Sequence, residues 1–374
     1  MTGRLEHMLK RPISKGGTPA HVQVQERVIA VIQEGLVKPG GRLPSEPELA
    51  EGLGVSRMTA NKALLALADQ GWVSRQKGRG TYVLSRQQQL SKFTLELIVG
   101  DNLELAIENY YFGALYFGVQ SAASEQRVPV HCRSLNSILE SEEELEADGV
   151  IVINPPLGSL ERLRSALARC RSKMILGAGW PGFQVPCIDS DNILGAALAV
   201  GHLADLGHRD LMLITACPDD ANTSDRIRGF DLACTIKGCR AVRPPLVAKE
   251  ALGLELELIE EFVRVMKGQE RPTALFVAGA ILALQVSRLV QQIGLSIPDD
   301  VSIVAYDDPG FLTTSYPPLD TIRQPLGEMG KTAFQMLIRS LEEGVAPPLQ
   351  TVLPPELIVR GSVVSPRPPS EKHK

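Results

Sequence analysis

The chain has 374 residues, more than one hydrophobic core usually serves, so two or three domains are expected. Charged residues make up 22% of the sequence, and no uncharged apolar run approaches the ~18 residues of a membrane helix. These values exclude a single small module and favour a soluble protein without a membrane partner. The first 18 residues are basic but lack the apolar run of a secretory signal, so we expect a cytoplasmic protein.

The net charge of −4 conceals two regions of opposite sign. Residues 1–92 hold 14 Lys and Arg against 7 Asp and Glu, whereas the rest of the chain holds 25 against 36. A basic segment followed by an acidic body is expected when the first segment binds a polyanion. Solvated surface charge alone also produces such a pattern, so motifs must decide between the two.

The cysteines are scattered, with no CxxC pair and no spacing typical of a zinc site or a disulfide framework. We interpret them as buried, reduced thiols, and we expect no metal and no cofactor. The six positions are Cys132, Cys170, Cys187, Cys217, Cys234 and Cys239.

Residues 21–86 predict a winged helix-turn-helix. A first helix begins near His21, Ser45 and Glu48 form the capping box of a second, and Ser56 can cap a third. The third helix has one apolar stripe with polar residues opposite it. Two short strands on either side of a glycine-bearing turn at residues 76–80 predict the wing.

Three blocks of this segment, residues 43–50, 54–59 and 78–83, resemble the GntR family of bacterial repressors, and residues 56–64 resemble its HutC branch. The resemblance implies that the third helix and the wing bind double-stranded operator DNA. A winged helix can also serve as a protein-interaction module. One departure is Pro47, because the family often has an arginine there that contacts DNA. The expected DNA contacts are Ser45, Ser56, Arg57, Thr59, Asn61, Lys62, Lys77, Gly78, Arg79 and Gly80.

From residue 95 onward, short apolar runs alternate with longer amphipathic ones, which is typical of parallel sheets with crossover helices. About 270 residues are too many for one such sheet, so we expect an α/β fold with two lobes and a cleft between them. The expected strands are residues 95–99, 149–153, 174–177, 211–215, 274–277 and 301–305, with helices at 194–206 and 282–293.

Five blocks of this second part resemble the ligand-binding domain of LacI/GalR-type regulators, which is similar to periplasmic sugar-binding proteins. They are residues 201–208, 226–230, 297–308, 317–325 and 353–362. A GntR-type head on such a periplasmic-binding-protein-like body is similar to regulators of the arabinose-repressor type in Bacillus. The expected organisation is a flexible tail at 1–20, a DNA-binding domain at 21–86, a linker at 87–94, a ligand-binding domain at 95–365 and a disordered tail at 366–374.

The resemblance implies effector contacts at Asn154, Arg226 and Asp307. These side chains suit a polyhydroxylated, saccharide-like small molecule, because a carboxylate accepts from hydroxyls and a guanidinium donates to them in fixed geometry. Asp307 could instead cap the turn after its strand.

Three aromatic residues, Tyr110, Tyr111 and Trp180, either stack on the ligand or pack between the lobes. Gly279 and Ala280 stand where the family usually has asparagine and aspartate. Ordinary pentoses and hexoses should therefore bind poorly. The cleft either admits a bulkier or longer saccharide or has lost ligand binding.

The sequence predicts a ligand-responsive transcriptional regulator, a repressor, that acts as a homodimer joined through its acidic body. We find no nucleophile with a base partner, so the protein is not expected to be an enzyme. Three alternatives remain: a solute-binding protein of the periplasmic type, a regulator whose body only dimerises, and an enzyme built on the same cleft.

Overall fold

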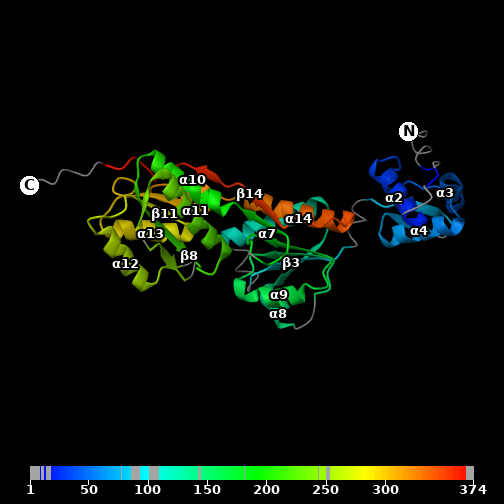
Figure 1. Ribbon diagram of the computed structural model, residues 1–374, viewed down its shortest axis with the longest axis horizontal. Coiled ribbons are helices and arrows are strands. Elements are labelled where there is room, and N and C mark those ends of the chain that lie inside the picture. The colour runs from blue at the N-terminus through cyan, green and yellow to red at the C-terminus, as the bar shows by residue number, and fades with distance from the viewer. Residues whose placement is uncertain are drawn as a thin grey trace, which may run out of the picture. The chain divides into compact units, whose positions relative to one another are not determined.

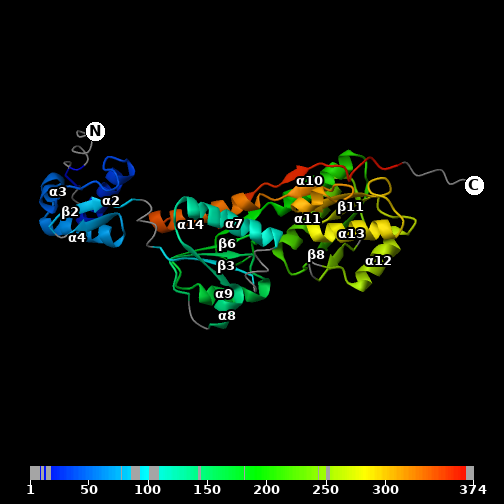
Figure 2. The same ribbon diagram turned by 180° about the vertical axis from the view of Figure 1, so that it is seen from behind.

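The computed structural model describes residues 9, 12–13, 18–76, 78–85, 93–100, 109–141, 145–180, 182–242, 244–249 and 253–367. The chain forms two compact units: the first holds residues 1–94 with 123–129, and the second holds the rest of the chain with both large β-sheets. Figures 1 and 2 show the two units from opposite sides.

The first unit is a winged helix-turn-helix, as predicted. It consists of α2 (Ala20–Gln33), α3 (Glu46–Leu53), α4 (Arg57–Asp69), β1 (Val73–Gln76) and β2 (Gly80–Val83). Apolar side chains from all five elements are buried in one cluster. The strands pair antiparallel from Val73 opposite Val83 to Gln76 opposite Gly80, so the wing turns between Gln76 and Gly80.

Part of the N-terminal segment that was predicted to be a flexible tail packs on this core, which corrects the prediction for its described residues. Leu9 is buried within the same apolar cluster, and Ile13 packs at the edge of that cluster. The Ile13 backbone N–H also donates to the Leu53 carbonyl at 3.1 Å. Burial of these two apolar side chains favours docking of the segment over a solvated tail.

The first lobe of the second unit is a parallel sheet with helices on both faces. Its elements are β3 (Leu95–Val99), α7 (Tyr110–Glu125), β4 (Val130–Ser134), α8 (Leu135–Glu140), β5 (Gly149–Ile153), η1 (Leu157–Ser159), α9 (Leu160–Ala166), β6 (Ser172–Leu176), β7 (Cys187–Ser190), α14 (Leu326–Glu343) and β14 (Gln350–Leu353). In the described residues the strand order is β14-β7-β6-β5-β3-β4. Helices α8 and α9 cover one face, and α7 and α14 cover the other.

The second lobe has the same layered construction. Its elements are α10 (Asn192–Asp205), β8 (Asp210–Ala216), α11 (Ala221–Lys237), β9 (Arg240–Ala241), β10 (Leu246–Ala248), α12 (Leu256–Met266), β11 (Ala274–Val277), α13 (Ala280–Gln292), β12 (Ser302–Tyr306), η2 (Gly310–Thr313), β13 (Asp320–Arg323) and β15 (Glu356–Ile358). Across the described residues the order is β10-β8-β11-β12-β13-β15, with β9 beside β8. Of the strands in the described part of this lobe, only β15 pairs antiparallel. Helices α12 and α13 cover one face, and α10 and α11 the other.

The chain passes between the lobes after β7, after β13 and after β14. Three separate connections therefore join the lobes, and the carboxyl ends of their parallel strands meet at the cleft. The predicted two-lobed α/β fold is confirmed, and each predicted strand lies within about two residues of an observed one.

Among the helices of the described residues, none has the length and apolar character needed to cross a membrane. Nor do three or more His, Cys, Asp or Glu side chains gather there closely enough to hold a metal ion. The six cysteines are free thiols, but Cys132, Cys217 and Cys239 are only half-buried, which corrects the expectation that all are buried.

The predicted linker and C-terminal tail are only partly described. Residues 93–94 of the linker and 366–367 of the tail are described, and the remainder lies outside the described residues. The Arg367 guanidinium lies 3.1 Å from the Asp299 carboxylate, so the start of the tail is tied to the second lobe.

Candidate functional site

Helix α4 begins with a side-chain cap and presents a cationic surface to solvent. The Ser56 hydroxyl accepts a hydrogen bond from the Thr59 backbone N–H at 3.1 Å, and the two hydroxyls lie 2.8 Å apart. Such a cap satisfies an otherwise unpaired N–H and fixes the first turn. Arg57, Met58 and Lys62 are exposed, and Met58 is 80% exposed. The first turns of the helix therefore offer side chains that a DNA groove can receive.

Ser45 is engaged by the start of α3. The Glu48 carboxylate accepts hydrogen bonds from the Ser45 backbone N–H and from its hydroxyl, each at 2.7 Å. These bonds lower the pKa of the Glu48 carboxyl. The Ser45 hydroxyl can donate to a phosphate only by giving up its bond to Glu48, and the exposed Pro47 beside it adds no side-chain donor.

Arg75 of β1 links the wing to helices α3 and α4. It was not predicted as a site residue. Its Nη1 donates to Oδ1 of Asn61 at 2.8 Å, and its Nη2 forms an ion pair with Glu46 of α3. The bond occupies the acceptor oxygen of Asn61. The Nδ2 group of Asn61 has no hydrogen-bond partner among the described residues, so Asn61 is presented as a donor.

The tip of the wing carries both predicted glycines. Gly78 has φ +75° and Gly80 has φ +120°, backbone conformations that other residues rarely adopt. A Cβ on Gly80 would also lie 2.7 Å from the Arg42 side chain. Arg79 is exposed, and its carbonyl accepts from the Tyr82 hydroxyl at 3.1 Å. Lys77, the other predicted cation of the wing, lies outside the described residues.

In the second unit, a cavity of about 680 Å³ lies between the lobes. Asn154, Cys217 and Asp307 directly follow β5, β8 and β12, and all three line the cavity. Their φ angles are +41°, +55° and +70°. Positive φ is uncommon for residues other than glycine, and such strain is concentrated at functional sites.

Five of the six predicted effector contacts line this cavity, and Trp180 does not. The five are Tyr110, Tyr111, Asn154, Arg226 and Asp307.

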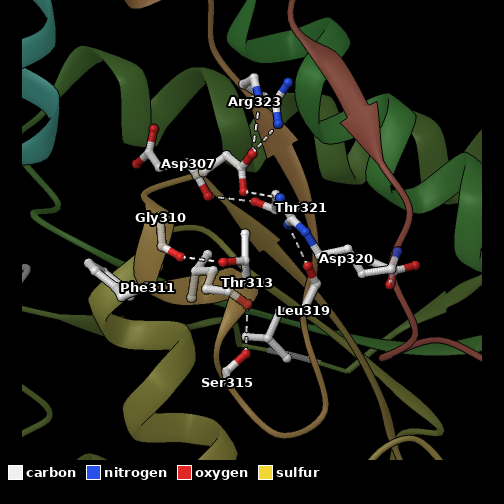
Figure 3. A network of polar contacts seen from close by, with 12 residues as sticks. Asp307, Gly310, Phe311, Thr313, Ser315, Leu319, Asp320, Thr321 and Arg323 are labelled. Carbon is white, nitrogen blue, oxygen red and sulfur yellow. Dashed lines mark hydrogen bonds and ion pairs between the residues drawn. The ribbon is translucent and has the colours of Figure 1, made fainter.

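A polar network beneath its turn holds Asp307 at the cavity wall (Figure 3). The Asp307 carbonyl accepts from the Thr321 hydroxyl at 2.5 Å, and the next residue, Asp308, accepts from Arg323 at 2.6 and 2.8 Å. The Asp307 carboxylate points away from Thr321, and its Oδ1 accepts from Gln324 at 2.6 Å. Burial raises the pKa of this carboxyl, although the charge of Arg226 and the Gln324 bond oppose the rise.

The alternative role of Asp307 as a turn cap is not observed, because no backbone N–H of the described residues donates to its carboxylate. The Oδ2 atom likewise has no hydrogen-bond partner within the described part of the chain. This oxygen is available to a ligand.

Arg226 is 8% exposed and lines the cavity from α11. Its Nε donates to Oδ1 of Asn192 at 2.9 Å, and its guanidinium carbon lies 3.9 Å from the centre of the Tyr306 ring. Neither Nη group forms a hydrogen bond with a described residue. The Nε edge of the buried guanidinium is therefore bonded to the protein, and its two Nη groups are available to a ligand.

Tyr111 of the first lobe is linked to the second lobe near Arg226, because its hydroxyl accepts from the Asn222 side-chain amide at 3.4 Å. Its hydroxyl donates to the Gly177 carbonyl at 2.9 Å, and the same carbonyl accepts from Asn222 of α11 at 2.8 Å. Asn192, which accepts from Arg226, also donates to Asn222 at 3.2 Å. The predicted contact Tyr111 therefore has a structural role, in a hydrogen-bonded chain that runs from the first lobe to Arg226.

Asp189 lies at the end of β7, where the chain leaves the first lobe. It is 6% exposed, and its Oδ1 accepts from the Ser190 N–H at 2.7 Å. Burial raises the pKa of its carboxyl to about 7, against the Ser190 bond and the charge of Arg226. The Asp189 carboxyl is thus a titratable group close enough to the Arg226 guanidinium for the charge of Arg226 to influence its pKa.

Gly279 and Ala280 line the cavity at the start of α13, which has no side-chain cap. Gly279 has φ 167°, an extended conformation, and a Cβ there would lie 3.6 Å from the Leu282 Cβ, an ordinary contact. A Cβ at 279 is therefore sterically tolerated, and the glycine provides no polar side chain to the cavity.

Trp180 lines a second space of about 270 Å³. Its Nε1 donates to the Pro155 carbonyl at 3.0 Å, which fixes the orientation of the indole ring. Asn154, Cys217 and Asp220 line both spaces, so the two adjoin.

Sequence reasoning missed several residues of the cavity. Asp220 caps α11 by accepting from the Asn222 N–H at 2.9 Å, and Thr223 donates to the Ala216 carbonyl at 2.7 Å. The signal for them was the polar start of a helix directly after the strand predicted at 211–215. Asn192, which accepts from Arg226, begins α10 directly after β7, and the sequence analysis did not predict that strand.

The chain matches two family models. Residues 20–83 match the model described as bacterial regulatory proteins, gntR family, and residues 200–363 match the periplasmic binding protein-like domain. Both matches fall on segments whose resemblance was read from the sequence.

Similar proteins extend over nearly the whole chain. An arabinose metabolism transcriptional repressor of Geobacillus stearothermophilus is 30% identical, over 92% of this chain and 97% of its own. One from Halalkalibacterium halodurans is 28% identical, over 86% and 88%. A crystal structure of a LacI family transcriptional regulator from Mycobacterium smegmatis has a TM-score of 0.61 at 24% identity and covers 73% of this chain and all of its own, which shows a shared fold.

The identity and coverage of the Geobacillus protein include both the head and the body of the chain. The winged helix, the two-lobed cleft and both family matches agree with that relationship. The chain belongs to the family of bacterial transcriptional repressors that join a gntR-type DNA-binding domain to a ligand-binding domain of the periplasmic-binding-protein type.

Proposed function

We propose that residues 21–86 bind operator DNA, that residues 95–365 bind a saccharide-like effector, and that the effector changes the affinity for the operator. The protein acts as a homodimer in the cytoplasm, where operator DNA is found. Relatives named as repressors of arabinose metabolism support a saccharide as the effector class.

The DNA contacts follow from the exposure of α4 and the wing. Arg57 and Lys62 project from the first half of α4, and Arg79 projects from the wing. Arginine can bind a guanine edge through two hydrogen bonds, whereas wing cations bind the phosphate backbone. We assign base reading to Arg57 and Asn61, and positioning to Lys62 and Arg79.

The observation that carries the effector site is the set of uncommitted polar groups around the cavity. Within the described residues, the Nη groups of Arg226, Oδ2 of Asp307 and the side-chain amide of Asn154 have no hydrogen-bond partner. Arg226 is buried, and buried polar groups are normally paired. Hydroxyl groups of a saccharide supply both donors and acceptors for them.

A homodimer follows from the small footprint of one winged helix. A single recognition helix covers too few base pairs for specific binding, and a symmetric dimer doubles the contacts on a pseudo-palindromic operator. We place the main dimer interface in the acidic body.

A thermal-shift screen of the full-length protein against monosaccharides and oligosaccharides tests the effector site. At least one saccharide should raise the melting temperature of the wild type. The same saccharide should not raise the melting temperature of Asp307→Asn or of Arg226→Lys. Both substitutions keep the size of the side chain but remove the carboxylate or the guanidinium fork. The saccharide should be recovered unchanged, because the protein is proposed to sense it and not to convert it.

Failure of every saccharide would contradict the proposed effector and favour a body that only dimerises. Turnover of the bound saccharide would favour the enzyme alternative instead. The Gly279→Asn variant is the matched gain-of-function control. A Cβ at this position makes only an ordinary contact, and the amide adds a polar group to the cavity wall, so the variant should improve binding of a simple pentose or hexose.

A further inference from the structure

We infer that the space beside Trp180 is a second subsite of the effector cleft, and that the effector is a saccharide of at least two rings. This inference rests on the proposed saccharide effector and specifies how many sugar rings that effector has. This space of about 270 Å³, called the side chamber, is lined by Asn154, Pro155, Trp180, Pro218 and Lys249, with their neighbours.

The side chamber adjoins the main cavity through shared walls. Asn154, Cys217 and Asp220 line both spaces. Two of these residues follow strands of different lobes, β5 and β8, and both have positive φ. A ligand held by the shared residues can therefore occupy both spaces at once.

The walls of the side chamber have the chemistry that a sugar ring binds. The Trp180 N–H is already bonded to the Pro155 carbonyl at 3.0 Å, so the indole offers a ligand mainly its apolar surface. Pro155, Pro156 and Pro218 have no N–H to leave unpaired and little freedom to move. A sugar ring has an apolar C–H face that packs on such a surface.

The rim of the chamber is charged. Asp219 and Lys249 are both exposed and lie beside the apolar wall. Opposite charges at the rim can accept from and donate to the outward hydroxyls of a ring whose face lies on Trp180. The main cavity keeps Arg226 and Asp307 for the first ring.

The position of Gly279 and Ala280 agrees with this division. They line the main cavity and provide no polar side chain to complete the contacts of a single ring. A second ring in the side chamber gains packing and hydrogen bonds that the main cavity does not supply.

Tryptophan fluorescence gives a direct readout, because the chain has only Trp72 and Trp180. In full-length protein with Trp72→Phe, Trp180 is the only tryptophan, so emission excited selectively from tryptophan reports on this residue alone. We would titrate it with two pairs, glucose and maltose, and arabinose and α-1,5-arabinobiose, and record both emission and melting temperature. One disaccharide should shift or quench Trp180 emission and bind at least tenfold more tightly than its monosaccharide.

The Trp180→Ala substitution should lower the affinity for that disaccharide to the level of the monosaccharide and leave the monosaccharide affinity unchanged. Trp180→Phe should recover part of the loss, because it restores an aromatic surface. Phe117→Ala removes a 62% exposed aromatic ring that lines neither space and should change neither affinity.

The possible failures are distinguishable. If a monosaccharide binds but neither disaccharide binds more tightly, or if Trp180→Ala weakens both equally, the second subsite is wrong and the saccharide effector stands. If no saccharide changes the melting temperature or the emission, the proposed effector class fails and the subsite fails with it.

Discussion

Replacement of Asp189 by asparagine probes the electrostatics beneath the cleft and requires no effector. Asp189 is 6% exposed, and burial raises the pKa of its carboxyl from 3.8 to about 7. The folded protein therefore binds this proton more tightly than the unfolded chain does. Stability from this group is present in acid and is lost as the pH rises from about 4 to about 7.

The magnitude follows from the two pKa values. A rise from 3.8 to about 7 corresponds to at most about 4 kcal/mol of unfolding free energy lost between acid and alkaline pH. Asparagine keeps an oxygen that can accept from the Ser190 N–H, but it carries no charge. Relative to the wild type, Asp189→Asn should gain stability as the pH rises, and the gain should level off above about pH 7.

Urea unfolding between about pH 4.5 and pH 8 measures this difference. A Trp72→Phe background restricts the fluorescence signal to Trp180, and therefore to the second unit. Asp219→Asn removes an exposed carboxylate and is the matched control for the change in net charge. A difference between Asp189→Asn and wild type that is independent of pH, or that favours the wild type at high pH, would refute the reasoning.

Three further predictions concern DNA binding and assembly. In gel-shift titrations, Arg57→Ala should weaken binding to a selected operator by about 1–3 kcal/mol, roughly 5-fold to 150-fold, and should affect random DNA far less. Arg75→Ala releases the Asn61 amide, so binding-site selection should show lower discrimination at one base pair, with little change in overall DNA affinity. An equal loss of affinity on all DNA sequences would show that Arg75 binds phosphate instead. Sedimentation of the full-length protein at micromolar concentration should give twice the 40.5 kDa chain mass, and a monomer would contradict the homodimer.

Local patterns predicted the winged helix and most strands of the body. Capping at Ser45 and Ser56 depends on residues three positions apart, and the apolar stripe of α4 depends on neighbouring turns, so both are visible in the sequence. Strand 149–153 is a continuous apolar run, as expected for a parallel strand buried on both faces, and strand 95–99 is apolar except for the half-buried Glu96.

The path of the chain between the lobes was not predictable in this way. Helix α14 and strand β14 are distant in sequence from the first lobe but complete its layers and its sheet. Their amphipathic patterns are satisfied by either lobe, so periodicity cannot choose between them. The packed N-terminal Leu9 was missed for a similar reason, since a lone apolar residue has no period.

The residues of the candidate site were also predictable where local patterns place them and not predictable where tertiary packing does. Asn154 and Asp307 follow strands that the sequence predicted, and parallel strands place their carboxyl ends together, so their meeting at the cavity follows from local patterns. The ion pair of Arg75 with Glu46 and the contact of Arg226 with Asn192 join residues 29 and 34 positions apart. Such contacts depend on tertiary packing, which a single sequence does not reveal.

The central claim is that an effector in the cleft controls binding of the winged helix to DNA. The most direct test is fluorescence anisotropy of an operator obtained by selection from random DNA, measured with full-length protein with and without the saccharide that most stabilises it. We predict that the saccharide changes operator affinity at least tenfold in the wild type and has no effect on Arg226→Lys. A saccharide that binds the cleft at saturation and leaves operator affinity unchanged would contradict this claim.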